Sequence, residues 1–310
     1  MGSWRRQRIS AGQRGEMVKP LPEHFYKYAT RKTAKLILEN RTLQWSAPAV
    51  LNDPFDVQFD MHLELDQERI KAIALPKLWS IIYENAPFEP GNRLGHLLKM
   101  ARPKYPKMSK EEFFRTRGKA IDQGFQNLVS NLPEHQAMVR DVMGRTKVLC
   151  FSEVPDSILM WAYYAEQQYG VVLVFRALVE SDSPWLAAKP IAYSEKIPPF
   201  VDENFLADMS AGLASMSAVD LMERMTLTKA REWAHEREWR VTLQQGFSAE
   251  PYEYFKFNVN DLESVIFGCL TSETDRAEIG ALVKKSYPHT KLKRAVKAAG
   301  EFKLLIEDIP

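Results

Sequence analysis

The sequence predicts a single α+β domain with a central mixed, mostly antiparallel sheet. Short apolar or alternating runs, typical of strands, occur near residues 25, 43, 148, 172, 240, 265 and 303. Segments with helical spacing separate these runs without regular βα repeats, which is the pattern of an α+β chain rather than of an α/β chain. Residues 67–147 contain only helical patterns. We therefore expect one domain over residues 20–310 that carries a helical insert at about 67–147.

Composition narrows the class of protein. The chain has 310 residues, of which 45% are hydrophobic and 26% charged, as in an ordinary globular protein with a sizeable core. The formal net charge of +2 argues against a nucleic-acid partner, although a local basic patch would still allow one. No run approaches the ~18–20 apolar residues of a membrane span, so we expect no membrane partner and a cytoplasmic location.

The two cysteines and the first residues complete this general picture. Cys150 and Cys269 lie in apolar, strand-like runs, which predicts buried, reduced thiols. Two cysteines are too few for a disulfide framework or a cysteine zinc site. Residues 1–19 are rich in arginine and lack the apolar core of a signal peptide, which predicts a disordered leader or an expression remnant.

The first structured segment predicts strand, helix, strand and loop in close succession. Residues 25–28 alternate aromatic and other side chains like a strand, and Thr30 offers an N-cap for a helix over 32–40. Residues 42–46 alternate as a second strand. The prolines that follow, at 48 and 54, indicate a polar loop. This opening resembles a compact βαβ unit.

The helical insert and the second half follow the same kinds of signal. Prolines divide the insert into helical stretches at 68–84, 93–101, 110–132 and 135–143. Strands are expected at 148–152, 171–175, 190–193, 237–244, 252–259 and 262–270, with helices from Pro155 to Ala165 and over 202–228. Residues 271–275 predict the N-cap of a helix that ends at Lys285, and residues 291–298 and 302–307 predict a terminal hairpin.

Residues 229–240, KAREWAHEREWR, form the densest cluster of chemically useful side chains. If the strand begins at Glu236, strand alternation places Glu236, Glu238 and Arg240 on one face. Such a carboxylate pair beside Trp and Arg side chains is typical of a binding or catalytic site. A segment rich in Glu, Arg and Lys is equally typical of a solvated helical face.

A second cluster is NDPFD at residues 52–56. An Asn or Asp side chain before proline commonly stabilises a turn, which accounts for Asn52 and Asp53 without any function. The alternative is that Asp53 or Asp56 lines a pocket. With Glu238, these aspartates would offer Mg²⁺ ligands to a nuclease, but no histidine lies at ligand spacing, so we expect no metal.

A third cluster joins a predicted strand end to the next helix. Ser152 ends a strand, and Trp161 and Tyr164 lie three apart on the helix that follows. Most aromatic side chains in such positions belong to the core. They would also suit a site that stacks on a planar ring and bonds its polar edge. The histidines, at 24 and 235 among others, assemble into no nucleophile–base set from spacing alone.

These segments, in this order, carry a resemblance to a family. The segments FYKY, LQWSAPAVLNDPFD, VLCFSE, LMWAYYAEQQYGVVLVF, KAREWAHEREWR and VIFG resemble the bacterial family catalogued as domain of unknown function 2971. The resemblance extends from about Phe25 to Asp308 and departs at Tyr163, where a histidine is expected. It implies a fold and the placement of motifs, and it implies no activity.

The architecture is also similar to ADP-ribosyltransferases, in which NAD is the co-substrate. That similarity assigns Lys27 or Tyr28 to grip ribose or phosphate, and Ser152, Trp161 and Tyr164 to hold nicotinamide. It assigns Glu238 or Glu236 to stabilise the oxocarbenium-like transition state. Glu238 is the first choice, because strand alternation would place it between Glu236 and Arg240 on their shared face. The implied activity is transfer of ADP-ribose, or NAD hydrolysis, in a bacterial toxin or anti-phage setting.

We expect one cleft to gather these side chains, namely Lys27, Tyr28, Asn52, Asp53, Ser152, Trp161, Tyr164, Glu236, Glu238 and Arg240. Arg240 would pair with Asp53 or Glu153, or clamp a phosphate. Besides the transferase, three alternatives remain at this stage. They are a non-enzymatic module that binds a nucleotide or protein in defence or stress, the Mg²⁺-dependent nuclease, and a purely structural charge cluster.

Overall fold

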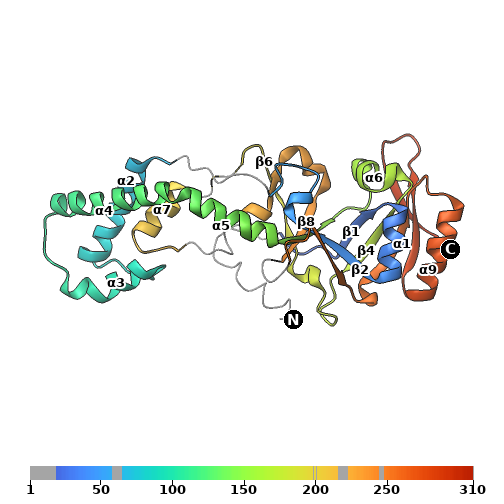
Figure 1. Cartoon of the computed structure of the whole chain (residues 1–310), viewed down its shortest axis with the longest axis horizontal. Coiled ribbons are helices and arrows are strands. Elements are labelled where there is room, and N and C mark those ends of the chain that lie inside the picture. Colours follow the sequence, from blue (N-terminus) through green and yellow to red (C-terminus); the bar gives the residue numbers. More distant parts are fainter. Residues whose placement is uncertain are drawn as a thin grey trace. The chain divides into compact units, whose positions relative to one another are not determined.

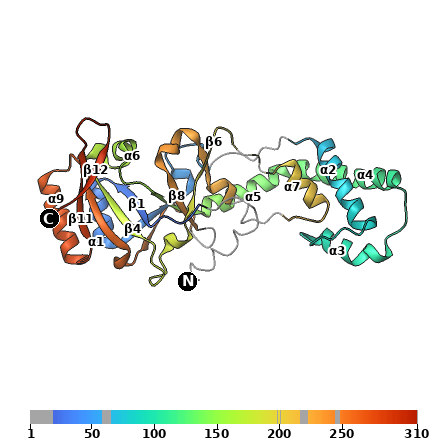
Figure 2. The same cartoon turned by 180° about the vertical axis from the view of Figure 1, so that it is seen from behind.

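The computed structural model describes residues 19–57, 65–197, 199, 201–215, 223–243 and 248–309. The leader expected at residues 1–19 falls almost entirely outside these ranges. The chain divides into two compact units (Figures 1 and 2). The first unit falls within residues 1–58, 143–196 and 226–310, and the second within residues 59–142 and 197–225.

The first unit is built on a mixed sheet, which confirms the predicted α+β class. In the described ranges the sheet has ten strands, and its main path runs β12-β11-β10-β4-β1-β3-β2-β9, with β8 beside β3 and β5 beside β8. Within this sheet, β10 and β11 pair in parallel, and the other pairs are antiparallel. The strands are β1 (His24–Ala29), β2 (Thr42–Ser46), β3 (Lys147–Ser152), β4 (Val171–Arg176), β5 (Lys189–Pro190), β8 (Glu238–Leu243), β9 (Tyr252–Lys256), β10 (Leu262–Phe267), β11 (Lys291–Lys297) and β12 (Leu304–Asp308).

Helices pack on both faces of this sheet. Side chains of α1 (Arg31–Asn40) and α9 (Glu273–Ser286) join one core cluster with Leu173 and Phe175 of β4. Side chains of α6 (Ile158–Tyr164) join another cluster with Val172 and Val174. The alternate residues of β4 therefore face opposite layers, which explains why its sequence is apolar throughout rather than alternating.

Local capping confirms several predicted helix ends. Thr30 accepts a hydrogen bond from the backbone N–H of Thr33 at the start of α1, and Ser272 accepts one from Asp275 at the start of α9. The helix expected from Pro155 begins instead at Ile158, because Ser157 provides the cap. Both cysteines are free and partly buried, so the expectation of buried, reduced thiols is met only in part.

The segment between residues 189 and 237 differs most from the prediction. The strand expected at 190–193 is divided into β5 and β6 (Ala192–Ser194). The helix expected over 202–228 is shorter, since α7 spans Glu203–Ser210 and β7 (Thr228–Ala230) pairs with β6 in a separate parallel ladder. A 3-10 helix then occupies Arg231–Glu236.

The second unit is helical. It contains α2 (Gln67–Tyr83), α3 (Arg93–Ala101), α4 (Lys110–Ser130) and α7, and α5 (Leu132–Arg145) runs into the first unit. Its core includes side chains of α2, Phe113 of α4 and Leu206 of α7. The predicted helical stretches of residues 68–143 thus correspond closely to observed helices.

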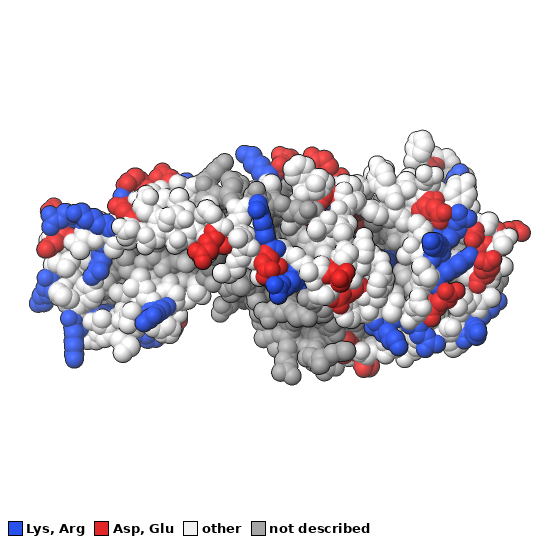
Figure 3. Space-filling view, in the orientation of Figure 1, with Lys and Arg blue, Asp and Glu red and all other residues white. Residues whose placement is uncertain are grey.

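Surface charges on the first unit are mixed in sign. Figure 3 shows acidic and basic side chains side by side over α1 and α9. Arg31 pairs there with Glu166 and Asp275, and Lys35 pairs with Asp275 and Glu278. Within the described ranges, no helix is long and apolar enough to cross a membrane.

Candidate functional site

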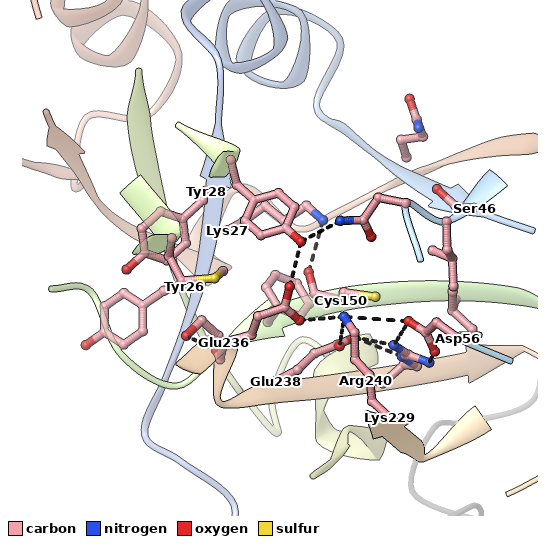
Figure 4. A pocket seen from close by; sticks show the side chains of 18 residues that line it. Tyr26, Lys27, Tyr28, Ser46, Asp56, Cys150, Lys229, Glu236, Glu238 and Arg240 are labelled. Carbon is pink, nitrogen blue, oxygen red and sulfur yellow. Dashed lines mark hydrogen bonds and ion pairs between the residues drawn. The ribbon is translucent and has the colours of Figure 1, made fainter. Parts of the chain in front are cut away.

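The strands β1 and β3 separate and leave a pocket in the sheet of the first unit. They share only one register pair, Tyr26 with Ser152, while β3 pairs along its whole length with β8 on its other side. The pocket has a volume of about 170 Å³, comparable to an engineered cavity of ~150 Å³ that holds benzene. Its lining side chains include Tyr26, Lys27, Tyr28, Gln44, Ser46, Asn52, Asp56, Cys150, Ser152, Tyr164, Lys229, Glu236, Glu238 and Arg240 (Figure 4).

Arg240 lies at the centre of a buried ion-pair cluster in the pocket wall. Its guanidinium donates two parallel hydrogen bonds to Asp56, at 3.0 and 2.9 Å, and one from Nε to Glu238 at 2.8 Å. It donates a further bond to the backbone carbonyl of Thr226. This fork geometry is the strong, specific form of an Arg–carboxylate pair. The prediction that Arg240 pairs with Asp53 or Glu153 is therefore wrong, and Asp56 is its partner.

Lys229 completes the cluster. Its Nζ lies 2.5 Å from Glu236, 3.2 Å from Glu238 and 3.6 Å from Asp56 (Figure 4). Lys229 was not expected in the cleft, because a lone lysine between Thr228 and Ala230 carries no sign of burial. Only its pairing with distant carboxylates explains why it is buried here.

The charges of this cluster do not balance. Asp56, Glu236 and Glu238 carry three negative charges when ionised, and Lys229 and Arg240 supply two positive charges. Burial alone would raise the pKa of Glu238, but Arg240 and then Lys229 outweigh it and hold that pKa at about 2. Burial raises the pKa of Glu236, and the neighbouring Glu238 adds to this rise against the pull of Lys229. The excess negative charge therefore falls on Glu236.

Tyr164 and Asn52 connect Glu236 to the other side of the pocket. The Tyr164 hydroxyl donates a hydrogen bond of 2.6 Å to Oε1 of Glu236, and Nδ2 of Asn52 donates one of 2.8 Å to that hydroxyl (Figure 4). Burial, followed by the charge of Glu236, raises the pKa of Tyr164. Tyr164 thus remains a neutral donor, as this hydrogen bond requires.

Ser152 holds the backbone that carries Glu236. Its hydroxyl donates a hydrogen bond of 2.7 Å to the carbonyl oxygen of Glu236 and accepts one from the backbone N–H of Val154. The hydroxyl of Tyr193 accepts the backbone N–H of Glu238 at 2.8 Å. Ser152 and Tyr193 therefore fix the two ends of the short turn at residues 236–238, and Ser152 acts as a positioning residue.

The two β1 residues assigned to the site play different parts. Nζ of Lys27 donates a hydrogen bond of 3.0 Å to the carbonyl of Cys150, across the gap between β1 and β3. Burial lowers the pKa of Lys27. The Tyr28 hydroxyl donates to the carbonyl of Val154 at 2.8 Å, and burial raises its pKa. Tyr28 consequently presents its ring, rather than a free hydroxyl, to the pocket.

The structure brings together most of the predicted site residues. Those that line the pocket are Lys27, Tyr28, Asn52, Ser152, Tyr164, Glu236, Glu238 and Arg240. Trp161 is fully buried, and its indole donates to the carbonyl of Pro155, so it belongs to the core. Asp53 is also outside the pocket lining, and its side chain accepts the backbone N–H of Phe55 in the turn expected of this motif.

The two glutamates face the pocket for a different reason from the one predicted. The strand β8 begins at Glu238, close to the predicted start at 237, whereas Glu236 ends a 3-10 helix. The condition that the strand begins at Glu236 is therefore not met. Arg237 between them adopts the left-handed conformation, with φ of 47°. This turn, rather than strand alternation, directs both carboxylates toward Lys229.

The cluster leaves no obvious place for a metal ion. In the parts of the chain that the structure describes, no group of three or more His, Cys, Asp or Glu is arranged to hold one. Lys229 and Arg240 occupy the space between the carboxylates that a cation would need. Asp53 and Glu238, two of the ligands considered for a nuclease, do not meet in this pocket.

The fold and site define an α+β protein with a charged pocket where its central sheet separates. The family model described as "Protein of unknown function (DUF2971)" matches residues 160–241. This segment contains Tyr164, Lys229, Glu236, Glu238 and Arg240, and over it the predicted resemblance to that family is confirmed. No curated protein and no solved structure matches the chain.

Proposed function

We propose that this pocket is the active site of an NAD-consuming enzyme that transfers ADP-ribose to an acceptor or hydrolyses NAD. One observation carries the proposal: a buried carboxylate that its cationic neighbours do not fully neutralise, Glu236, lies in the wall of a ring-sized pocket. A positioned carboxylate in a water-poor site stabilises the positive charge that develops at a ribose C1′.

The geometry favours Glu236 over Glu238 for this role. Glu238 shares its oxygens with Arg240 and Lys229, and its pKa is held at about 2, as expected of a carboxylate already neutralised by its partners. Among the residues that the structure describes, Lys229 is the only cationic partner of Glu236, whose second oxygen accepts from Tyr164 at the pocket wall. This reverses our sequence-based preference, which placed Glu238 first.

In the proposed reaction, the bond between ribose C1′ and the nicotinamide nitrogen breaks. Nicotinamide leaves with the bonding electron pair, and an acceptor oxygen or nitrogen, or water, attacks C1′ and releases its proton. Glu236 stabilises the oxocarbenium-like charge, and the ring of Tyr28 and the Asn52–Tyr164 pair shape the space for the planar group. A pocket of about 170 Å³ suits the nicotinamide end of NAD, and the rest of the dinucleotide would extend outside it.

The test is release of nicotinamide from NAD by purified protein, measured by mass spectrometry of the small molecules. We expect release by the wild type and its loss in Glu236→Gln, which keeps the size of the side chain. Glu232→Gln is the matched control, since Glu232 lies exposed in the same 3-10 helix. Loss in both variants, or unchanged release in Glu236→Gln, contradicts the role of Glu236.

A cellular version tests the proposed toxin or anti-phage setting. Expression of the wild type in bacteria should lower the NAD content, and Glu236→Gln at the same expression level should not. An unchanged NAD content with well-folded wild-type protein counts against this setting and leaves the in vitro assay to decide the activity itself.

A second candidate is a module that binds a nucleotide or protein without turnover. The observation that favours it is the close pairing of Asp56, Glu238 and Arg240, because a rigid, preformed wall is sufficient for recognition. This candidate predicts that NAD or another nucleotide raises the melting temperature while no nicotinamide is released. Release of nicotinamide that depends on Glu236 excludes it.

A further inference from the structure

The pocket contains two lysines in contrasting surroundings. Lys229 is held by Asp56, Glu236 and Glu238, each within 3.6 Å of its Nζ. Lys27 forms no ion pair with any residue that the structure describes, and its Nζ donates to the carbonyl of Cys150 at 3.0 Å. Figure 4 shows Lys27 among the side chains that line this pocket, with its nitrogen directed toward Cys150. Lys27 is thus a pocket amine that a backbone carbonyl, rather than a carboxylate, holds in place.

Burial of Lys27 in the pocket wall favours its uncharged amine. On the neighbouring strand β3, the thiol of Cys150 is protonated at neutral pH, because burial raises its pKa to about 12. Across the pocket, Glu238 favours the charged ammonium of Lys27, but Glu238 is itself paired with Arg240 and Lys229. Burial therefore dominates, and it lowers the pKa of Lys27.

A neutral amine keeps its hydrogen bond to Cys150 and gains a nucleophilic lone pair. Two N–H groups remain on the uncharged nitrogen, and one is sufficient for the carbonyl of Cys150. Lysines that burial desolvates are the kind that attack carbonyl compounds, because their free base is present at neutral pH. The open pocket beside Nζ provides the space for such a compound.

We infer that Lys27 is a nucleophilic residue that condenses with a ring-sized aldehyde or ketone in the pocket to form an imine. The nitrogen lone pair attacks the carbonyl carbon, and the carbonyl π electrons move to the oxygen. The oxygen then leaves as water with two protons, both of which come from the nitrogen of the free amine, and a C=N bond remains. The step needs no oxidant, reductant or metal, and it does not depend on NAD turnover.

The experiment traps this imine with a probe of the right size. The full-length protein is incubated at pH 7 with 4-hydroxybenzaldehyde and cyanoborohydride, which reduces the protonated imine to a stable secondary amine. Intact-mass spectrometry counts the adducts, and peptide mapping locates them. Lys32 in the exposed part of α1 and Lys229 in the same pocket are compared in the same sample.

We expect the adduct to form first at Lys27. The adduct yield at Lys27 should exceed that at Lys32 by roughly tenfold for each unit by which the pKa of Lys27 is lowered. The reason is that the free-base fraction of the amine rises by that factor. Lys229 should remain unmodified. Lys27→Arg should lose the dominant adduct, and the matched control Lys32→Arg should retain it.

Two outcomes overturn the inference. One is an adduct yield in the wild type that is no higher at Lys27 than at Lys32. This result does not depend on the folding of any variant. The other is a dominant adduct that persists in Lys27→Arg. Both measurements are independent of nicotinamide release. Absence of the Lys27 adduct would therefore not contradict the proposed NAD chemistry, and absence of nicotinamide release would not contradict imine formation at Lys27.

Discussion

The hydroxyl of Tyr164 donates a 2.6 Å hydrogen bond to the carboxylate of Glu236, the residue on which the excess charge of the buried cluster falls. Tyr164 comes from α6 and Glu236 from the 3-10 helix before β8, so this bond joins two elements that are 72 residues apart. It is directed at the oxygen that Lys229 does not contact. The pair therefore defines how Glu236 is presented to the pocket.

Replacement of Tyr164 by Phe tests this relationship. A hydrogen bond to a charged group contributes about 1.5–3 kcal/mol, so nicotinamide release should fall by roughly ten- to hundredfold. The bond from Tyr164 lowers the pKa of Glu236, so its loss should raise that pKa further. Activity that depends on the ionised carboxylate should then disappear at a higher pH on the acid side. The pH profile of kcat measures this shift, and a profile identical to that of the wild type contradicts it.

Glu236 and Glu238 should respond in opposite directions when their charge is removed. The raised pKa of Glu236 means that its ionisation destabilises the fold as the pH rises above the ordinary value of 4.5. Glu236→Gln should therefore increase the melting temperature at pH 7 while it removes activity. Such a trade of stability for function is common at active sites.

Ionisation of Glu238 has the opposite effect on the stability of the fold. Its pKa is lowered from 4.5 to about 2, so its ionised form stabilises the protein above pH 4.5, and this stability is lost as the pH falls from 4.5 through 2. Glu238→Gln should lower the melting temperature at pH 7 and should flatten the loss of stability in that acidic range. Thermal unfolding of both variants over pH 2–8 compares the signs, and a stabilised Glu238→Gln protein would refute the charge balance described above.

Arg240 should be the most costly residue of the cluster to remove. Its guanidinium contacts Asp56 and Glu238, and neither carboxylate has another arginine nearby in the described cluster. Loss of one partner of a buried ion pair costs about 3–5 kcal/mol. Without Arg240, the carboxylates of Asp56 and Glu238 stay buried and share Lys229 with Glu236. Arg240→Met should lower the free energy of unfolding by an amount of this order, measured by urea denaturation.

An exposed arginine provides the control for that measurement. Arg231 pairs with Glu195 at the surface, where both side chains are largely exposed. Exposed ion pairs contribute about 0–1 kcal/mol, so Arg231→Met should lower the free energy of unfolding by at most about 1 kcal/mol. Equal effects of the two substitutions would show that the buried cluster does not support the fold.

Local patterns in the sequence predicted most of the helices and strands. Thr30 and Ser272 cap helices as expected, and the apolar run of β4 is buried on both faces. These signals act over a few residues and depend little on the rest of the chain. They were sufficient to predict the α+β class. Eight of the ten residues assigned to the cleft line the pocket, and those assignments came from the motifs and their resemblance to known families.

Long-range pairing accounts for what the sequence did not reveal. The partner of Arg240 lies 184 residues away, and Asp53 and Asp56 are equally plausible from their sequence positions. Trp161 and Tyr164 lie three apart on α6, yet one packs into the core and the other contacts Glu236. The left-handed conformation of Arg237 ended the alternation on which the choice of Glu238 rested, and no glycine or asparagine marks it.

Ser152 provides a test that separates positioning from binding. Its hydroxyl contacts the backbone carbonyl of Glu236 at 2.7 Å rather than a carboxylate. Ser152→Ala leaves that buried carbonyl without this donor, which should cost about 1–3 kcal/mol of stability. Because the Glu236 carboxylate would then be less well oriented, kcat for nicotinamide release should fall while KM stays nearly constant. Ser152→Thr retains a hydroxyl and should restore part of kcat. A rise in KM with unchanged kcat would instead mean that Ser152 binds the substrate directly.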